Sequence, residues 1–223
     1  MAFLGQGVLA IWNGVQQGNE DAFLDWHVNE HIPERVGLPG FLRARRYTAV
    51  KAHPAFFNFY EVADPAVLVS KPYLDRLNDP TDWTKRVVST FTDTSRTLCQ
   101  VALSDSRGVG SHVAVLRCDI RVSGDDQGLR EAVQRLRAGQ GICGVHLLYE
   151  EKPATPITTS ENKLRDRPDA TWPVVLIVEA LSAEAAQGVL DTALAGLVRA
   201  GLPEPAARDV YALQYLLDEG DLE

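Results

Sequence analysis

The alternation of apolar and polar residues predicts two similar groups of elements along the 223 residues of the chain. Runs rich in apolar and β-branched residues predict strands, and apolar residues at helical spacing predict helices. In the first half, the expected order is strand, helix, strand, strand, helix, strand. The strands predicted in this half are 7–15, 41–50, 55–63 and 97–103.

Helices of the first half are indicated by their start and stop signals. The first is expected to begin at Asn19, a typical N-cap residue. It is expected to end near His31, because Pro33 disfavours the helical region in the residue before it. A second helical stretch within 64–96 is broken by Pro72 and Pro80.

The same order of elements is predicted in the second half, after a small, polar linker at 104–110. Its expected strands and helices are strands 112–122, 143–150, 173–180 and 210–217, and helices 127–138 and 182–202. The polar, proline-rich segment 151–171 interrupts this order. A long loop in a compact domain is usually functional or mobile, so we expect either a lid over a barrel end or a disordered hairpin tip.

Two consecutive βαββαβ units predict an α+β chain of two ferredoxin-like units, with antiparallel sheets and helices on one face of each sheet. We expect the first unit at 1–105 and the second at 106–223. Strand residues are apolar in both phases, with Val8, Ala10 and Trp12 alternating with Leu9 and Ile11. Both faces of the sheet therefore need cover. The second sheet is the simplest cover, which predicts a barrel-like pseudo-dimer within one chain.

Composition narrows the functional class. The net charge is −8 and the isoelectric point is about 5.2, which disfavours general binding to nucleic acid or to an anionic membrane. We identify no signal peptide and no apolar run of the ~20 residues that a membrane helix needs. Cys99, Cys118 and Cys143 are an odd number without metal-binding spacing. This pattern favours buried thiols and a cytoplasmic location.

One segment carries a family resemblance. The string WHVNEHIPER at 26–35, followed by LPGF at 38–41 and RRY at 45–47, resembles the dimeric α/β-barrel superfamily, most closely its EthD-like branch. The resemblance implies two ferredoxin-like units paired into a barrel, here as a tandem repeat. It implies a reaction only weakly, because the superfamily includes monooxygenases, isomerases, cyclases, decarboxylases, haem enzymes and proteins without known activity. The second half lacks this motif.

His27 and His31 are the leading candidate catalytic residues, since both lie on one helical face and imidazole titrates near neutral pH. We expect His31, or less readily His27, to be a general acid or base. The string HVNEH also matches the H-x-x-E-H zinc pattern, which we reject because such enzymes are much longer and because Pro33 truncates the helix. We predict no metal and no cofactor. Equally open is a structural role in which one histidine packs on the sheet.

Further candidate site residues are the basic and aromatic side chains of the strands. Arg43, Arg45 and Tyr47 share one strand face, and Arg46 points to the other. The arginines are candidates to bind an anionic substrate, or they form salt bridges to Glu30, Glu34 or Glu61. Tyr47 and Tyr60 are candidate proton donors. Trp12 and Trp26 are candidates to line an apolar pocket, although core packing explains aromatic residues equally well.

Three functions follow from these residues. The first is a small-molecule-binding protein that catalyses cofactor-independent isomerisation, cyclisation, dehydration or decarboxylation of an aromatic or polyketide-like compound. The second is a non-catalytic binding or stress-related module in which the motif is structural. The third is a haem or metal-dependent oxidoreductase. In all three, the expected partner is a small organic molecule, with a homodimer possible.

Overall fold

Eight antiparallel strands close into a barrel in the computed structural model, which describes residues 3–122, 127–152, 158–164 and 169–222. Around the barrel the order is β1-β3-β2-β8-β5-β7-β6-β4. The strands are β1 (Gly7–Val15), β2 (Phe41–Lys51), β3 (Phe56–Val62), β4 (Phe91–Ser106), β5 (His112–Cys118), β6 (Ile142–Glu150), β7 (Val174–Ala180) and β8 (Ala207–Asp218). This closed arrangement confirms the predicted α+β fold class.

Each half of the chain supplies one continuous arc of the barrel. The first half contributes β4-β1-β3-β2 and the second contributes β8-β5-β7-β6, which is the ferredoxin-like strand order in both cases. The arcs join where β2 pairs with β8 and where β4 pairs with β6. All eight strand pairs therefore form within one chain. The division into units at 1–105 and 106–223 stays a prediction.

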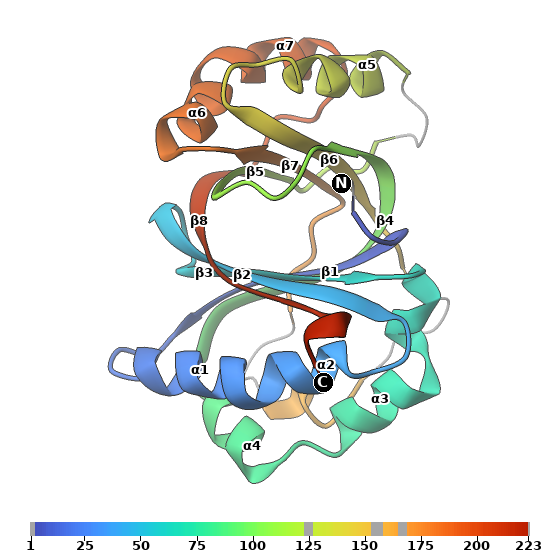
Figure 1. Cartoon of the computed structure of the whole chain (residues 1–223), viewed down its shortest axis with the longest axis vertical. Coiled ribbons are helices and arrows are strands. Elements are labelled where there is room, and N and C mark those ends of the chain that lie inside the picture. Colours follow the sequence, from blue (N-terminus) through green and yellow to red (C-terminus); the bar gives the residue numbers. More distant parts are fainter. Residues whose placement is uncertain (1–2, 123–126, 153–157, 165–168, 223) are drawn as a thin grey trace.

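Helices cover the barrel on two opposite sides (Figure 1). Those of the first half are α1 (Glu20–Trp26), the π-helical turn η1 (His27–His31), α2 (Ile32–Val36), the 3₁₀ turn η2 (Pro65–Val69), α3 (Lys71–Asn78) and α4 (Asp82–Val88). Those of the second half are α5 (Gln127–Leu136), α6 (Ala183–Gly188), the π-helical turn η4 (Val189–Ala193) and α7 (Leu194–Arg199). Two further short 3₁₀ turns are η3 (Asn162–Leu164) and η5 (Glu219–Asp221).

The first-half sheet buries both of its faces, as its apolar pattern predicts. Val8, Ala10 and Trp12 point into the barrel, where they pack with residues from the opposite arc. Leu9 and Ile11 point outward and pack against the first-half helices. Because successive side chains of a strand point to opposite faces of the sheet, one strand contributes to two different environments. Each side chain of these strands therefore contributes to one side of the sheet or the other.

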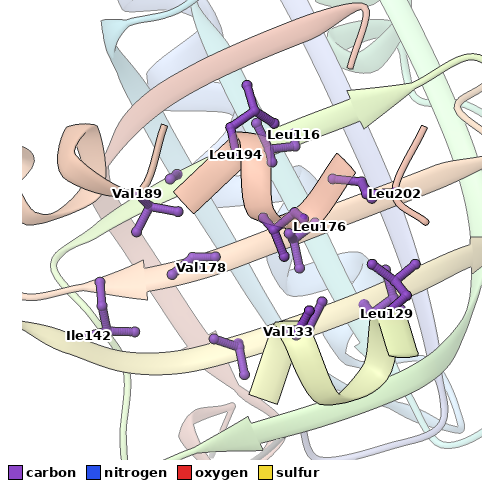
Figure 2. Close-up of a cluster of buried hydrophobic side chains, with 14 of the residues drawn as sticks. Leu116, Leu129, Val133, Ile142, Leu176, Val178, Val189, Leu194 and Leu202 are labelled. Carbon is purple, nitrogen blue, oxygen red and sulfur yellow. The ribbon is translucent and has the colours of Figure 1, made fainter. Parts of the chain in front are cut away.

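In the second half, the space between sheet and helices is filled by apolar side chains (Figure 2). Leu129 and Val133 of α5 meet Leu116, Leu176 and Val178 of the strands, and all five are nearly inaccessible to solvent. Close packing of this kind leaves no space for a ligand. This layer is a hydrophobic core.

Some predicted boundaries are wrong. The helix does not end near His31 but continues to Val36, with Pro33 near the start of α2. A proline ring clashes with the carbonyl group four residues earlier, and the wider π turn at η1 relieves this clash. The N–H of Ile32 accordingly donates to the carbonyl oxygen of His27, five residues back. Asn19 occupies the N-cap position without a capping hydrogen bond from its side chain.

The linker and two strands also differ from prediction. β4 extends to Ser106, so the predicted linker at 104–110 is partly strand, and β5 ends at Cys118 rather than at residue 122. Within the segment 151–171, residues 153–157 and 165–168 lie outside the described part of the chain. The described part includes Glu161, which packs against the first-half helices.

Candidate functional site

A buried polar pocket lies between the outer face of the first-half sheet and the elements α1, η1, α2 and α3. Four of the predicted site residues line it: Trp26, His27, His31 and Tyr60. The pocket is lined further by Leu9, Ile11, Asn13, Phe23, Arg35, Asn58, Tyr73, Phe91, Thr94, Arg96 and Glu161. Its enclosed volume is only about 30 Å³. That space suits one or two water molecules, so a larger ligand requires the pocket to open.

The π-helical turn places the two histidines of the motif together. His27 and His31 are buried, and their rings stack with centroids 5.4 Å apart and planes 17° apart. A π turn adds one residue to the helix and is often found at functional sites. Here it aligns both imidazoles toward Tyr60, whose ring lies edge-on to His31 at 6.2 Å.

The hydrogen bonds of His27 fix its tautomer. Nη1 of Arg46 lies 3.1 Å from Nδ1 of His27, and the hydroxyl of Tyr60 lies 3.3 Å from Nε2. Because a guanidinium only donates, Nδ1 must accept, and Nε2 carries the ring proton. Nε2–H then donates to the oxygen of Tyr60. The Tyr60 hydroxyl hydrogen is then not used in this contact and can be donated to another acceptor.

Electrostatics support the same assignment. Burial lowers the pKa of His27 well below its usual value, and the positive charges of Arg46 and Arg35 lower it further. His27 is therefore neutral near pH 7. Burial raises the pKa of Tyr60, so its hydroxyl keeps its proton. The arrangement presents a neutral hydrogen-bond donor backed by a neutral imidazole.

Arg46 brings an uncompensated positive charge to this site. Its partners are Nδ1 of His27, the side-chain oxygen of Gln214 at 2.9 Å and the ring of Tyr215 at 5.5 Å. Among the residues that the structure describes, none forms a carboxylate ion pair with it. Burial lowers the pKa of Arg46, but arginine stays charged in proteins. Its charge favours negative charge developing at a ligand near Tyr60.

Glu30 anchors the motif helix and does not orient a histidine. Its Oε1 accepts hydrogen bonds from the indole of Trp26 at 3.1 Å, from Thr81 at 2.6 Å and from Thr84 at 2.9 Å. These bonds tie η1 to the start of α4. Trp26 is thereby held against His31, with ring centroids 4.3 Å apart.

The opposite wall of the pocket is built from pairs of polar residues. Arg35 donates to Glu161 at 2.7 Å, and Arg96 donates to the hydroxyl of Tyr73 at 2.9 Å. Glu161 thus brings a second-half residue to a first-half pocket.

Two buried atoms of the pocket residues have no hydrogen-bond partner among the described residues: Nη1 of Arg35 and Oδ1 of Asn58. Nη1 of Arg35 has only a long ion pair with Glu34, at 3.7 Å. Buried polar atoms are rarely left unpaired without a functional reason. One donor and one acceptor are therefore available to a bound molecule.

The other four predicted site residues lie across the sheet, inside the barrel. Arg43 donates to Glu61 at 2.8 Å, and Arg45 bridges Glu61 at 2.9 Å and Glu179 at 2.8 Å. Of the salt bridges considered from sequence, the one to Glu61 is present. These pairs occupy both guanidinium groups and hold them away from the His27 pocket.

Tyr47 and Trp12 belong to the same interior. Burial raises the pKa of Tyr47 to about 12, with Arg45 partly opposing the rise. Trp12 stacks on Phe57 at 4.7 Å and lies beneath the guanidinium of Arg117 at 5.0 Å. The sheet therefore separates the two predicted tyrosines, with Tyr60 in the pocket and Tyr47 in the barrel.

Within the parts of the chain that the structure describes, no group of three or more His, Cys, Asp or Glu side chains is arranged to hold a metal ion. Both ring nitrogens of His27 already have hydrogen-bond partners. Cys99 and Cys118 are buried, and Cys143 is half-buried. Among the described helices, none is long and apolar enough to span a membrane.

Sequence reasoning missed several pocket residues. Asn13, Asn58 and Arg96 come from strands outside the motif, Arg35 is the last residue of the motif, and Glu161 comes from the other half. The period-two pattern did place Arg46 on the face opposite to Arg45, which is the face of the pocket. That signal could have identified Arg46 as the partner of His27.

Comparisons with known proteins support the fold. No protein-family model matches the sequence, and no curated protein matches it. A crystal structure of an anthrone oxidase-like protein is similar over 97% of this chain and 94% of its own, with a TM-score of 0.63 and 13% identity. A provisionally named monooxygenase from Fusobacterium nucleatum is similar over 96% of this chain and 95% of its own, with a TM-score of 0.54 and 10% identity.

A provisionally named chlorite dismutase is similar over 98% of both chains, with a TM-score of 0.53 and 11% identity. At such low identity, these likenesses establish the fold alone. They agree with a ferredoxin-like barrel of the dimeric α/β type. An EthD-like relationship stays a prediction.

Proposed function

We propose that the pocket binds a small organic molecule with an acceptor oxygen, to which Tyr60 donates a hydrogen bond. The observation that carries this proposal is the chain from Arg46 to His27 to Tyr60, in which every donor is assigned and the last hydrogen is free. A donor fixed in advance costs little reorganisation when the ligand binds. The unpaired atoms of Arg35 and Asn58 supply further ligand contacts.

The reaction that this geometry supports best is cofactor-independent proton transfer beside a carbonyl group. His31 takes a proton from a carbon conjugated with the carbonyl, such as the methylene carbon of anthrone, and the C–H electron pair forms a new carbon–carbon double bond. The carbonyl electrons move through the conjugated system to oxygen, where Tyr60 and the charge of Arg46 stabilise the extended enolate. Return of the proton from His31 to a different carbon of that conjugated system completes an isomerisation without any other reactant.

The other predicted functions are less well supported. A haem or metal-dependent oxidoreductase is not favoured at His27, because both of its ring nitrogens already have hydrogen-bond partners. A non-catalytic module predicts binding without proton transfer, which the experiment below distinguishes. A cytoplasmic location and a homodimer stay predictions.

Anthrone is a suitable first probe, since one structural neighbour is called an anthrone oxidase-like protein and anthrone is an aromatic ketone with exchangeable C–H protons. The assay follows exchange of these protons for deuterium by NMR, together with the dissociation constant of anthrone. Tyr47→Phe is the matched control for Tyr60→Phe, because both remove a hydroxyl from a buried tyrosine of the same sheet.

We expect the wild-type protein to accelerate exchange above the rate in buffer. Tyr60→Phe should reduce the acceleration by roughly 10²-fold, as for loss of one oxyanion donor, whereas Tyr47→Phe should preserve it. Equal rates for the wild type and Tyr60→Phe would contradict the role of Tyr60. Binding of anthrone without any accelerated exchange would favour the non-catalytic module.

A further inference from the structure

The proposed pocket is too small for the molecule that it is proposed to bind. Its volume is about 30 Å³, whereas sites for organic ligands usually enclose roughly 300–1,000 Å³. Either the pocket expands alone or it joins a neighbouring space. The second possibility has direct structural support.

An open groove of about 930 Å³ lies beside the pocket, at one end of the barrel. It is bordered by the start of β4, by Trp172 and by the start of β8. Phe91 and Thr94 line both the groove and the pocket. The start of β4 is therefore the wall between the two spaces.

Phe91 is the larger of the two shared residues. Its ring packs edge-on against Phe23 at 5.7 Å and against Trp26 at 6.1 Å, on the side of the pocket. Phe91 is half-buried, so its displacement would not open the main core.

The backbone beside Phe91 is irregular. The pairing of β1 with β4 shifts between Trp12 and Gly14, and Asp93 on β4 has a φ of 51°. A bulge and a left-handed residue other than glycine are both common beside functional sites. The wall is thus interrupted at the position where the two spaces adjoin.

The chemistry of the groove indicates what it would bind. Its lining includes two arginines and two aspartates. Arg117 pairs with Asp209 at 2.9 Å, and Arg208 pairs with Glu204. Little net charge is left to attract an ionic ligand. Trp172 and Phe91 add aromatic surface, which favours contact with a flat, apolar ring system.

We propose that the groove and the pocket form one bipartite ligand site, with Phe91 as the specificity-determining residue at their junction. The ligand is an uncharged, flat molecule of two or more rings. Its acceptor oxygen reaches Tyr60, and its body lies in the groove against Trp172. This inference rests on the proposed function, but its first test needs no ligand.

The first test measures access to the pocket with a thiol probe. Ile11 lines the pocket and is half-buried, so Ile11→Cys places a thiol there. The rate of its reaction with N-ethylmaleimide is compared in three backgrounds: Phe91 unchanged, Phe91→Ala and Phe91→Trp. Trp83→Ala is the matched control, since Trp83 packs in the same aromatic cluster but lines neither space. The half-buried Cys143, in the second half, is the internal standard for folding.

Labelling should be faster by roughly tenfold with Phe91→Ala and slower with Phe91→Trp, because reaction at a buried site follows the open population. Trp83→Ala and Cys143 should show unchanged rates. If residue 91 leaves the Ile11→Cys rate unchanged while Cys143 behaves normally, the pocket opens elsewhere and the inference is wrong. If Phe91→Ala also raises the Cys143 rate, Phe91→Leu replaces it in the same comparison.

A second test compares phenol, with one ring, and 1-naphthol, with two. Trp172→Ala should weaken binding of 1-naphthol by roughly tenfold, as expected for loss of an aromatic contact, and should leave phenol binding unchanged. Equal weakening of both ligands would overturn the bipartite site. If the labelling rate depends on residue 91 but neither phenol nor 1-naphthol binds, the access route stands and the proposed function fails.

Discussion

The two helix–sheet layers of this protein have the same architecture and opposite chemistry. In the second half, α5 presents Leu129 and Val133 to the sheet, four residues apart. In the first half, the motif helix presents His27 and His31 at the same spacing. One layer is the apolar core of Figure 2, and the other encloses polar side chains and a cavity.

The strands beneath these helices differ in the same way. Beneath the second-half helices, the opposite pairs Ala114–Val178 and Leu116–Leu176 of β5 and β7 are apolar. Beneath the first-half helices, the opposite pairs Leu9–Tyr60 and Ile11–Asn58 of β1 and β3 each include a polar side chain.

The comparison shows where binding capacity arises in this fold. Buried polar groups stabilise less than close apolar packing unless all their hydrogen bonds are made. The first half retains such groups around the pocket, where Nη1 of Arg35 and Oδ1 of Asn58 have no hydrogen-bond partner among the described residues. The second half supplies the packing, and the first half holds the site.

The largest expected effect is on stability, from a cavity in the second-half core. Leu176 is fully buried, so Leu176→Ala should lower the free energy of unfolding by about 2–5 kcal/mol. Denaturant unfolding followed by circular dichroism measures this change. Binding of anthrone at the first-half pocket should persist, and loss of binding in a still-folded variant would show that the layers are not independent.

Removing the buried arginine that donates to His27 should have the next largest effect. Arg46→Gln deletes the donor to Nδ1 of His27, which should cost about 1–3 kcal/mol of stability because a buried acceptor loses its partner. Exchange of the anthrone protons should slow as well, since Tyr60 loses its fixed orientation. An unchanged exchange rate would show that Arg46 is only a structural residue.

Acid should destabilise the protein through its buried histidines. The pKa of His27 is lowered in the folded state, mainly by burial, so below about pH 6.5 the unfolded chain binds more protons than the folded chain. Stability should therefore fall as the pH falls through this range, by up to about 1.4 kcal/mol per pH unit for each such histidine. Unfolding of wild type and His27→Gln at several pH values tests this, and the variant should have the shallower slope.

His146 gives a matched comparison for this pH effect. It lies inside the barrel, where it bonds Glu179 at 3.0 Å, and burial lowers its pKa too. His146→Gln should reduce the pH slope in the same direction without changing exchange of anthrone protons. If the free energy of unfolding depended on pH equally in the wild type and both variants, the claim that these histidines are buried and neutral would be contradicted.

The smallest expected effect concerns a helix cap of the second half. Ser182 accepts a hydrogen bond from the backbone N–H of Ala185 at the start of α6. Ser182→Ala should cost about 1 kcal/mol of stability. Thermal unfolding measures the loss, and an altered exchange rate of anthrone would be unexpected, since α6 does not line the pocket.

Much of the fold was predictable from sequence, because the spacing of apolar residues identifies strands and helices. The order of these elements along the chain then indicates the ferredoxin-like units. The span of β1 agrees with prediction, and the helix predicted from residue 182 begins there, with Ser182 as its N-cap. The extension of the helix past Pro33 was not predictable from local propensity. It depends on a π turn, whose wider geometry removes the clash that normally ends a helix at proline.

The candidate site was only half predictable. The motif indicated His27 and His31, and an aromatic strand indicated Tyr60, because these are sequence signals. Arg43 and Arg45 share a strand with Arg46, yet of the three it is Arg46 that contacts His27, a pocket residue. Long-range partners such as Glu161 depend on tertiary contacts between distant segments, which one sequence does not reveal.

The central claim is that Arg46 fixes His27 as the Nε2–H tautomer and so directs the Tyr60 hydroxyl toward the ligand. The most direct measurement is ¹⁵N–¹H NMR of protein with labelled histidine, across pH 5–8. The account predicts a His27 ring with the proton on Nε2, an unprotonated Nδ1, and no change of state near pH 6.5. A proton on Nδ1, or titration of His27 near its ordinary pKa, would contradict it.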